Sequence, residues 1–360
     1  MARLQQTLLG WYEACRRDLP WRRTRDPYAI WVSEIMLQQT RVETVIPYYE
    51  RFLSRFPTAM ALAEAPPDEV LAMWSGLGYY RRARLLLEGA RAVAAKGGAL
   101  PAERAGLVSV PGIGRYTAGA IASIAFGEPV GLVDGNVARV FARVFAIDED
   151  MRKQGMRTAE ALADAIVAER DPGAWNQALM ELGATVCTPR SPSCDACPLS
   201  RASMCRAHRE GRVAELPVLS AKKPPEARRM QAIVAIRPRD GAVLMLRRRA
   251  ERTFGGLWEP PTIEGAPRMR KVLASWLPID ARTLERVGTV EHVLTHRALS
   301  VDVARAELTS ALAPRDLPDD AGYDAVRVVR PVASREGREE GMGVSTLAKK
   351  ILARATQKTP

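Results

Sequence analysis

Four of the five cysteines in this 360-residue chain lie within a single stretch of nineteen residues. Cys187, Cys194, Cys197 and Cys205 are spaced C-x6-C-x2-C-x7-C, while Cys15 stands alone. Because the first residues lack the apolar core of a secretory signal, we expect a reducing compartment, where clustered cysteines bind metal rather than form disulfides. Zinc and iron–sulfur clusters both accept four thiolates, but zinc ribbons usually carry two C-x2-C pairs and this loop has one. The spacing favours an iron–sulfur cluster, and Cys15 is predicted to be a packing residue.

The residue pattern divides the chain into an all-α part, a linker and a smaller α+β part. Apolar residues recur at helical spacing within residues 1–210, and Gly and Pro separate these segments. Residues 211–229 are polar and basic, contain a Pro-Pro pair and lack apolar periodicity, which is typical of an interdomain linker. Residues 230–360 combine alternating segments with an Asp-Gly turn and two helical segments. The predicted helices cover residues 28–46, 68–75, 84–95, 117–126, 136–145, 158–169, 266–277 and 345–355, and the predicted strands cover 230–237, 242–249, 299–303 and 325–329.

The charge balance points to a polyanionic partner. Lys and Arg number 53 against 41 Asp and Glu, which leaves a formal charge of +12. Nucleic acid is the first partner that such an excess suggests, and an anionic membrane surface the second. The sequence has no apolar run of transmembrane length, so a membrane-spanning protein is not expected.

A short turn between two predicted helices fits the phosphate of such a partner. Pro111, Gly112, Ile113 and Gly114 lie at the centre of this helix-hairpin-helix pattern, at about residues 105–120. Glycine permits close backbone approach, and the amides that open the second helix attract an anion. An ordinary glycine-capped connection is the alternative, but the proline, both glycines and the small-residue helix that follows favour a nucleic-acid phosphate clamp.

Two carboxylates are placed where acid–base chemistry could use them. Glu34 stands in the apolar segment IWVSEIML, where burial would raise its pKa and suit a general acid, with Gln38 one turn further on. A solvated surface glutamate is an equal alternative from this segment alone. Asp134 and Asn136 flank a glycine just before a helix, where an N-cap is the simple interpretation. A second carboxylate is also what cleavage of a glycosidic bond would need beside Glu34.

Aromatic and arginine side chains occur together in two segments. Trp21 and Arg22 lie in RRDLPWRR, and Tyr79 and Tyr80 lie in GLGYYRRAR. A base flipped out of a duplex needs a stacking pocket, and the space it leaves needs a filler. For each segment alone, core packing or a basic helix face is at least as good an interpretation.

In combination these motifs resemble the endonuclease III superfamily, through the helix-hairpin-helix, the VDGNV that follows it and the cysteine loop after WNQALMELGATVC. WVSEIMLQQT, GLGYYRRAR and GGLWEPP are similar to MutY-type adenine DNA glycosylases. The resemblance implies a multi-domain protein: an all-α helix-hairpin-helix glycosylase domain at 1–210 with its iron–sulfur loop at 187–205, a linker at 211–229, and a small α+β, Nudix-like lesion-recognition domain at 230–360. It also implies removal of adenine mispaired with 8-oxoguanine or guanine.

Carried over by position, the resemblance assigns a role to each motif residue. Glu34 would protonate adenine, Asp134 would stabilise or covalently trap the cationic sugar with support from Asn136, and Tyr116 would assist. Tyr116 stands where bifunctional relatives carry a Schiff-base lysine, and a tyrosine cannot form that imine, so a monofunctional enzyme is implied. The adenine pocket would comprise Arg17, Leu19, Trp21, Arg22 and Gln177, with Gln38 beside it. Two residues, Gln39 and Tyr79, would wedge into the duplex. The ligands of a 4Fe-4S cluster would be Cys187, Cys194, Cys197 and Cys205.

The sequence departs from that family in two places. The lesion-reading Phe-Ser-His segment is replaced by Leu294-Thr295-His296, which loses the aromatic ring and predicts weaker lesion preference. A buried strand residue before a turn is the alternative for Leu294. The last two cysteines are separated by seven residues instead of five.

In the α+β part, the segment after GGLWE has no glutamate-bearing helix to hold divalent metal, so a recognition role is expected there rather than hydrolysis.

The expected partner is double-stranded DNA that contains adenine opposite 8-oxoguanine or guanine, bound by a monomer in base-excision repair. The expected location is the cytoplasm with its bacterial nucleoid, or another DNA-containing intracellular compartment. Two alternatives stay open: an endonuclease III-type glycosylase/lyase for oxidised pyrimidines, and a non-catalytic iron–sulfur DNA-binding protein. The tyrosine at position 116, the presence of Glu34 and the second domain argue against the first.

Overall fold

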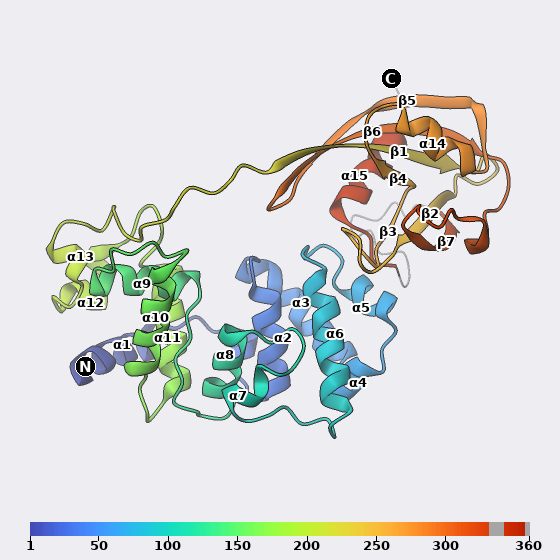
Figure 1. Cartoon of the computed structure of the whole chain (residues 1–360). Coiled ribbons are helices and arrows are strands. Elements are labelled where there is room, and N and C mark those ends of the chain that lie inside the picture. The colour runs from blue at the N-terminus through green and yellow to red at the C-terminus, as the bar shows by residue number, and fades with distance from the viewer. Residues whose placement is uncertain (331–341, 357–360) are drawn as a thin grey trace. The chain divides into compact units, whose positions relative to one another are not determined.

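The computed structural model describes residues 1–330 and 342–356, and these residues form two compact units. The helical unit comprises Met1–Glu64 and Leu85–Lys222, and the sheet unit comprises Ala65–Arg84 and Lys223–Pro360. The contacts place residues 65–84 with the sheet unit, although they precede it by more than a hundred positions; a linear reading of the sequence does not show such an exchange. Both units appear in Figure 1. No helix in the described residues combines the length and the apolar character that a membrane span needs.

The helical unit is built around a core in which α9 and α11 pack together and α1 packs on α11. Residues 28–36 of its helix α2 are buried without interruption, and α8 and α9 contain similar buried runs at 117–123 and 137–144. The helices with residues in this unit are α1 (Ala2–Cys15), η1 (Pro20–Arg22), α2 (Pro27–Leu37), α3 (Val42–Arg55), α4 (Ala59–Ala63), α6 (Arg81–Ala94, shared with the sheet unit), α7 (Arg104–Leu107), α8 (Arg115–Ala125), α9 (Gly135–Phe145), α10 (Gln154–Ala165), α11 (Pro172–Thr185), η2 (Cys194–Ala196), α12 (Pro198–Arg201) and α13 (Arg206–Arg209).

Two expectations about the helical unit are corrected. The helix predicted over residues 28–46 is broken, because Gln38 leaves helical geometry and Gln39 adopts a positive φ of 57° before α3 begins. Cys15, expected to pack in the core, is exposed at the end of α1. Amphipathic periodicity predicts which residues are helical, but it does not show whether other parts of the chain cover the last turn of the helix.

The sheet unit is an α+β structure with a seven-stranded mixed sheet in its described residues. The central order is β3-β2-β1-β6-β5; β4 also pairs with β1, and β7 with β2. β1 and β6 are parallel, and the other paired strands are antiparallel. The elements are α5 (Pro67–Met73), β1 (Glu226–Ile236), β2 (Val243–Arg248), β3 (Trp258–Glu259), β4 (Thr262–Glu264), α14 (Met269–Trp276), β5 (Ile279–Val293), β6 (Arg297–Leu308), η3 (Pro314–Asp316), β7 (Tyr323–Val329) and α15 (Thr346–Thr356).

Strand alternation sends the apolar side chains of β1 into two separate cores. Ala232 and Val234 face a core that α15 covers, whereas Ile233 and Ala235 face a core that includes Leu273 of α14. A helix therefore packs on each face of the sheet, as the burial of both faces of β1 requires.

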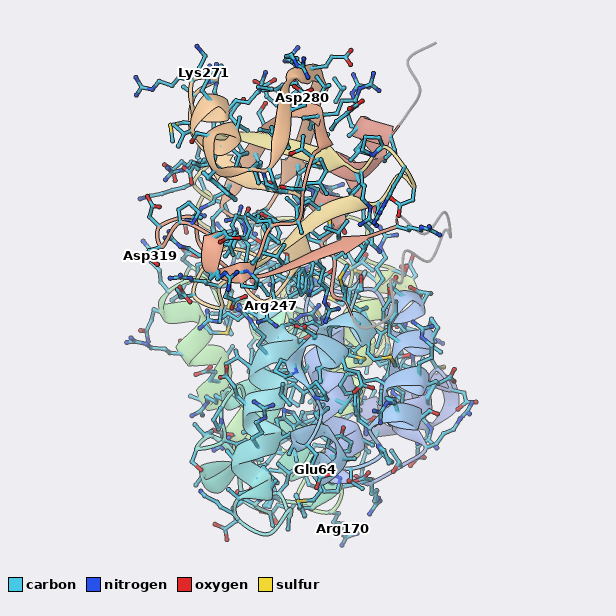
Figure 2. The ribbon with its side chains drawn as sticks, turned by 90° about the vertical axis from the view of Figure 1, so that its right-hand side faces the viewer. Glu64, Arg170, Arg247, Lys271, Asp280 and Asp319 are labelled. Carbon is cyan, nitrogen blue, oxygen red and sulfur yellow. The ribbon has the colours of Figure 1, made fainter. Side chains whose placement is uncertain are left out.

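An arginine of the sheet unit joins its two sequence segments. Arg247 on β2, labelled in Figure 2, lies with Nη1 3.2 Å from Asp68 and Nε 2.8 Å from Asp324. Asp68 belongs to α5, so this ion pair connects the segment 65–84 to the sheet.

Two strands differ from the prediction. β1 already begins at Glu226, inside the predicted linker, and β5 was not predicted at all.

Candidate functional site

A cavity of about 820 Å³ opens in the helical unit, and most of the residues singled out in that part of the sequence line it. It is formed by the segment before α2, by α2 and its C-terminal turn, and by α8, α9 and α11. The predicted residues that line it are Arg17, Leu19, Trp21, Arg22, Glu34, Gln38, Gln39, Tyr116, Asp134, Asn136 and Gln177.

Glu34 is a buried acid rather than a surface residue, since only 5% of it is exposed. It belongs to the buried stretch of α2, where the surrounding side chains are apolar. Burial is the largest influence on the pKa of Glu34 and raises it, a hydrogen bond from Tyr116 lowers it, and smaller effects of Asp134 (raising) and Arg22 (lowering) bring the pKa to about 7. The Tyr116 hydroxyl donates to Glu34 Oε2 over 2.6 Å. Near neutral pH this carboxyl therefore has a proton to give.

Asp134 is the N-cap of α9, as the simple interpretation predicted, and it also lines the same cavity as Glu34. Its Oδ1 accepts the Val137 backbone N–H at 2.7 Å, and its Oδ2 accepts Asn136 Nδ2 at 3.0 Å. Burial is the largest influence on its pKa and raises it, while both hydrogen bonds act in the opposite direction. Arg139 in turn donates to Asn136 Oδ1 at 2.8 Å, which fixes the amide that supports the carboxylate.

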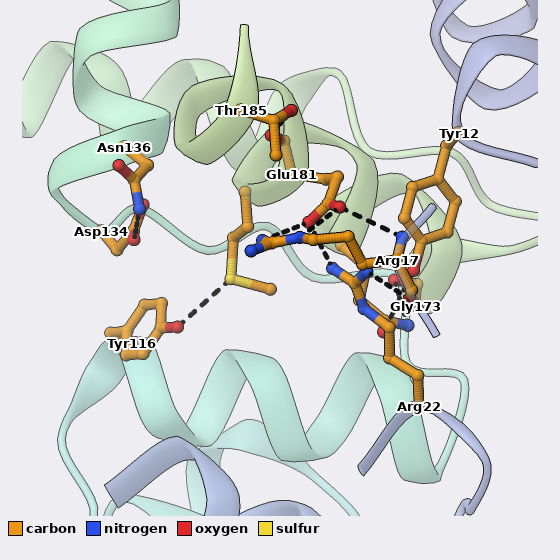
Figure 3. Close-up of polar contacts among 11 residues, drawn as sticks. Tyr12, Arg17, Arg22, Tyr116, Asp134, Asn136, Gly173, Glu181 and Thr185 are labelled. Carbon is orange, nitrogen blue, oxygen red and sulfur yellow. Dashed lines mark hydrogen bonds and ion pairs between the residues drawn. The ribbon is translucent and has the colours of Figure 1, made fainter. Parts of the chain in front are cut away.

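A third acid, Glu181, holds two arginines at the cavity wall, and the sequence analysis missed it (Figure 3). Arg17 binds it through Nε and Nη2, each at 2.8 Å, and Arg22 Nη2 reaches the same carboxylate at 2.8 Å. Burial would raise the pKa of Glu181, but the hydrogen bonds from both arginines outweigh it and lower the pKa to about 2. Its position four residues after Gln177, on the same face of α11, was the available signal.

A short chain of hydrogen bonds holds Gln177 in the same cavity wall. The Tyr12 hydroxyl donates to Gln177 Oε1 at 3.3 Å, and Gln177 Nε2 donates to the Gly173 carbonyl at 3.3 Å. The Arg22 guanidinium lies 5.4 Å from the centre of the Tyr12 ring. Hydrogen-bonding groups of both polarities are thus fixed around the space that a planar ligand could occupy.

The predicted hairpin lies between α7 and α8, outside the cavity lining. Gly112 needs to be glycine, because its φ is 81° and an added Cβ would lie 2.8 Å from Leu85 Cβ. Gly114 is the N-cap of α8 and has open space where a side chain would be, so an anion can approach the first-turn amides. Pro111 and Gly114 are exposed, which keeps this turn accessible.

The four clustered cysteines line one small cavity of the helical unit. Arg143, only 2% exposed, donates from Nη1 to Cys187 Sγ at 3.3 Å and has no carboxylate partner within ion-pair distance in the described residues. This buried guanidinium, which also donates to the carbonyls of Leu216, Thr188 and Pro189, brings positive charge to the cysteines, as suits a site that carries negative charge.

In the sheet unit, the segment 294–296 forms the turn between β5 and β6. The Leu294 N–H donates to the Arg297 carbonyl at 2.7 Å, while Thr295 and His296 are exposed. Leu294 is half-buried against the core beneath α15, so the alternative of a packing residue describes part of its surroundings. Tyr79 adopts a positive φ of 48°, is 48% exposed, and places its hydroxyl 3.1 Å from Thr295 Oγ1.

Three segments of the chain match known protein families. Residues 32–165 match the HhH-GPD superfamily base excision DNA repair proteins, residues 187–201 the iron-sulfur binding domain of endonuclease III, and residues 232–353 the NUDIX domain. The iron–sulfur match ends before Cys205.

Relatives that align with most of this chain agree with these matches. The chain is 38% identical to the adenine DNA glycosylase of Rattus norvegicus, over 83% of this chain and 69% of that protein. It is 39% identical to the adenine DNA glycosylase of Homo sapiens, over 82% of this chain and 65% of that protein. Among solved structures, a thermostable thymine-DNA glycosylase is 30% identical with a TM-score of 0.53, covering 58% of this chain and 96% of that one.

Proposed function

The chain belongs to the adenine DNA glycosylases, iron–sulfur enzymes of base excision repair that remove adenine from DNA, and from this premise we propose that its substrate adenine lies opposite 8-oxoguanine or guanine. The observation that carries the chemical part is the meeting of Glu34 and Asp134 in one cavity. A buried acid and a second carboxylate are the pair that cleavage of an N-glycosidic bond needs.

In the proposed first step, Glu34 gives its proton to the adenine ring. Protonation turns the base into a better leaving group, so the bond to the sugar weakens before any nucleophile attacks. A pKa of about 7 keeps much of the carboxyl protonated near neutral pH, and Tyr116 keeps it oriented through the 2.6 Å hydrogen bond.

In the second step, Asp134 stabilises the positive charge that develops on the sugar. Its two carboxylate oxygens are held by Val137 and Asn136, so little reorganisation accompanies the charge separation. The electron pair of the broken bond leaves with adenine, a water then adds to the sugar carbon, and the proton that this water loses returns to the Glu34 carboxylate. The same geometry is compatible with a covalent aspartyl intermediate and with an ion pair.

The adenine itself is proposed to lie between the Arg17–Glu181–Arg22 cluster and the apolar side chains of Leu19 and Trp21. Trp21 is fixed by an edge-to-face contact with Tyr49 at 5.4 Å between ring centres, which gives the pocket a rigid aromatic wall. Gln177 and Gln38 supply amides for the edge of the base. A flipped base is held by this combination of stacking and edge hydrogen bonds.

The enzyme is proposed to be monofunctional and to leave an abasic site. Tyr116 occupies the position of the lysine that lyases use, and no lysine is among the described residues that line the cavity. Without an amine there, no imine forms with the sugar and the strand is not cut.

Recognition of the opposite base is assigned to the turn Leu294-Thr295-His296, with Tyr79 and Gln39 as wedges. Both wedge residues have positive φ, a conformation that costs about 1–3 kcal/mol in a residue with a side chain and that is found preferentially at functional sites. The hairpin at Pro111, Gly112, Ile113 and Gly114 is proposed to bind a backbone phosphate, and the four cysteines, Cys205 included, to ligate the 4Fe-4S cluster. The bound form is proposed to be a monomer on duplex DNA, within whichever compartment holds that DNA.

The deciding experiment uses a duplex with one adenine opposite 8-oxoguanine, incubated with enzyme and then treated with or without hot alkali. Strand breaks that appear only after alkali support a monofunctional glycosylase. Breaks without alkali would indicate the lyase alternative, and no breaks under either treatment would leave the non-catalytic DNA-binding alternative. Glu34→Gln, which keeps the size of the side chain, is expected to bind the duplex and release about 100-fold to 10,000-fold less adenine. A duplex with adenine opposite thymine is the substrate control.

A further inference from the structure

Asp164, near the end of α10, joins the starts of the two helices that flank the predicted phosphate hairpin. Its Oδ1 lies 2.6 Å from Nη1 of Arg104, the first residue of α7. Its Oδ2 lies 2.8 Å from Nη2 of Arg115, the first residue of α8. One carboxylate therefore bridges the two sides of the turn at residues 111–114.

The same carboxylate also holds the chain that follows α8. Oδ1 of Asp164 accepts the Gly131 N–H at 3.0 Å, and Arg104 Nη1 donates to the Gly131 carbonyl at 3.4 Å. The backbone of α10 approaches this segment so closely that a Cβ on Gly131 would lie 2.3 Å from the Ala163 carbonyl carbon. Asp164 thus accepts hydrogen bonds from three separate segments, with α10 as their common support.

The surroundings of Asp164 favour its ionised form. Burial would raise the pKa of Asp164, but hydrogen bonds from Arg104 and Gly131 and the charges of Arg104 and Arg115 outweigh it, so the pKa lies below its ordinary value. The side chain of Asp164 is 31% exposed and that of Arg104 is 23% exposed. Salt screens partly buried charges less than exposed ones, so this pair persists at the ionic strengths at which proteins bind DNA.

The hairpin needs such support, because amides that bind a phosphate must be aligned before it arrives. Donors that are already held in place lose less conformational freedom when an anion binds. Ile113, only 3% exposed, anchors the centre of the turn in the core. That anchor does not reach the first turn of α8, which begins at Arg115. Asp164 holds this end of the hairpin, with Glu160 as a second acid 3.7 Å from Arg115 Nε.

Electrostatics alone makes the opposite prediction for an acid in this position. A carboxylate near a phosphate clamp repels the DNA backbone, so its neutralisation should tighten duplex binding. If Asp164 acts mainly by holding the hairpin, its neutralisation should instead loosen the clamp and weaken binding, in spite of the added net positive charge. The direction of the change in affinity therefore separates the two effects.

We propose that Asp164 is a positioning residue for duplex binding, which keeps residues 111–114 and the first turn of α8 in the geometry that accepts a backbone phosphate. This inference rests on the phosphate-binding role proposed above for the hairpin. Asp164 does not line the cavity that holds Glu34 and Asp134, so it acts on binding and not on the chemical step.

The test measures fluorescence anisotropy of a labelled duplex that carries a tetrahydrofuran abasic site, which a glycosylase cannot process, opposite 8-oxoguanine. The protein is the full-length, iron-loaded chain. Asp164→Asn keeps an oxygen for the Gly131 N–H but removes the charge that holds both arginines, and we expect about three- to tenfold weaker binding. Glu169→Gln, at an exposed acid shortly after α10, is the matched control for the loss of one negative charge and should bind as tightly as the parent or more tightly.

A second variant tests the clamp itself. Gly114→Asp places a carboxylate at the amides that the phosphate would contact, and the open space at this N-cap position accommodates the side chain. It should fold and bind the duplex at least about tenfold more weakly. If Asp164 acts through the hairpin, adding Asp164→Asn to Gly114→Asp should weaken binding little further. Single-turnover adenine release by Asp164→Asn at saturating enzyme should match the parent.

Each failure has its own signature. Unchanged binding by Gly114→Asp would overturn the clamp, and this inference with it. Normal or tighter binding by Asp164→Asn beside a weakened Gly114→Asp, or fully additive effects in the double variant, would overturn the positioning role alone.

Hydrogen exchange of the free protein separates positioning from general loosening of the fold. In Asp164→Asn the amides of residues 112–118 should exchange faster, while those of α2 should exchange as in the parent. Faster exchange throughout the helical unit, or slower adenine release at saturating enzyme, would assign Asp164 a general structural role and overturn the proposal.

Discussion

The Tyr116 hydroxyl lies 2.6 Å from Oε2 of Glu34, and the hydrogen bond between them opposes the rise in pKa that burial imposes on this carboxyl. Burial is the larger influence, so the pKa of Glu34 still reaches about 7. Two opposing influences, burial and the hydrogen bond from Tyr116, therefore set the pKa of Glu34. The hydrogen bond can be removed by deleting a single oxygen atom.

Tyr116→Phe is expected to move the pH profile of adenine release. Glu34 acts as an acid only when protonated, so release should be fast below a pH of about 7 and decline as the pH rises through that value. Removing the hydrogen bond that lowers the pKa of Glu34 raises it further, which shifts the decline upward by about one pH unit. Single-turnover release measured across pH tests this, with Tyr48→Phe, outside the cavity, as control; a shift to lower pH would contradict it.

Asp134→Asn is expected to separate the capping role of Asp134 from its chemical role. Asparagine caps helices as well as aspartate does, so the variant should keep its melting temperature, but it cannot stabilise a cationic sugar. Adenine release should fall by at least about 100-fold. Asp134→Ala should lose both activity and about 1 kcal/mol of stability. An Asn variant that unfolds early while retaining activity would leave only the structural role.

Glu181→Gln is expected to weaken the fold in a pH-dependent way. The pKa of Glu181 is about 2, below its ordinary value of 4.5, so its stabilising contribution is present above about 4.5 and disappears as the pH falls toward 2. The variant leaves Arg17 and Arg22 without their shared anion, and we expect a loss on the order of 2 kcal/mol near neutral pH, reduced because Arg17 is 35% exposed. Urea unfolding at pH 7 and pH 3 measures it; an equal difference at both values would argue against the ion cluster.

Leu294→Phe is expected to sharpen discrimination between 8-oxoguanine and guanine opposite adenine. The exposed Thr295 hydroxyl and the nearby Tyr79 hydroxyl already supply polar contacts at this turn, and the ring that Leu294 lacks would add stacking worth about 1 kcal/mol or more. The ratio of release rates on the two duplexes should rise several-fold. Leu312→Phe, a half-buried position outside this turn, is the control, and an unchanged ratio in Leu294→Phe would remove this turn from lesion reading.

Cys205→Ser is expected to lower the iron content of the purified protein, whereas Cys15→Ser should not. Cys205 is buried in the same cavity as the other three clustered cysteines, and Cys15 is exposed on α1. Serine lacks the thiolate that iron–sulfur clusters prefer, so the loaded fraction should drop. Iron analysis and visible absorption report this independently of enzymatic activity. Equal iron in both variants would assign the fourth ligand to another residue.

The sequence was most informative where one residue type has few uses. Four cysteines in one loop predicted a cluster, and the family comparisons agree. Glu34 was undecided, because an apolar segment around a carboxyl does not reveal whether the helix is buried on every side; the structure shows that α2 is. Glu181 was missed, since its partners Arg17 and Arg22 lie more than 150 residues away and pair with it only in the folded chain.

Strands were harder to predict than helices in this chain. β5 escaped prediction because its exposed and buried residues do not alternate regularly, and its pairing with β6 shifts register near Gly288. An irregular ladder removes the two-residue period on which strand prediction depends. The sequence also did not show that residues 65–84 belong to the sheet unit. That assignment depends on contacts between distant segments, such as the one between Arg247 and Asp68.

Seven residues separate the last two clustered cysteines, and the fold of this stretch still brings Cys205 to the other three. The seven intervening residues fold into the single turn α12 and a reversal at Ser203, whose φ is 58°, and the chain returns Cys205 to the cavity that holds the other three thiols. The segment that matches the iron-sulfur binding domain of endonuclease III ends at residue 201, before this cysteine. Geometrically, such a loop is constrained at the point where four sulfurs meet, and the length of chain between two of them can differ as long as both ends return to that point.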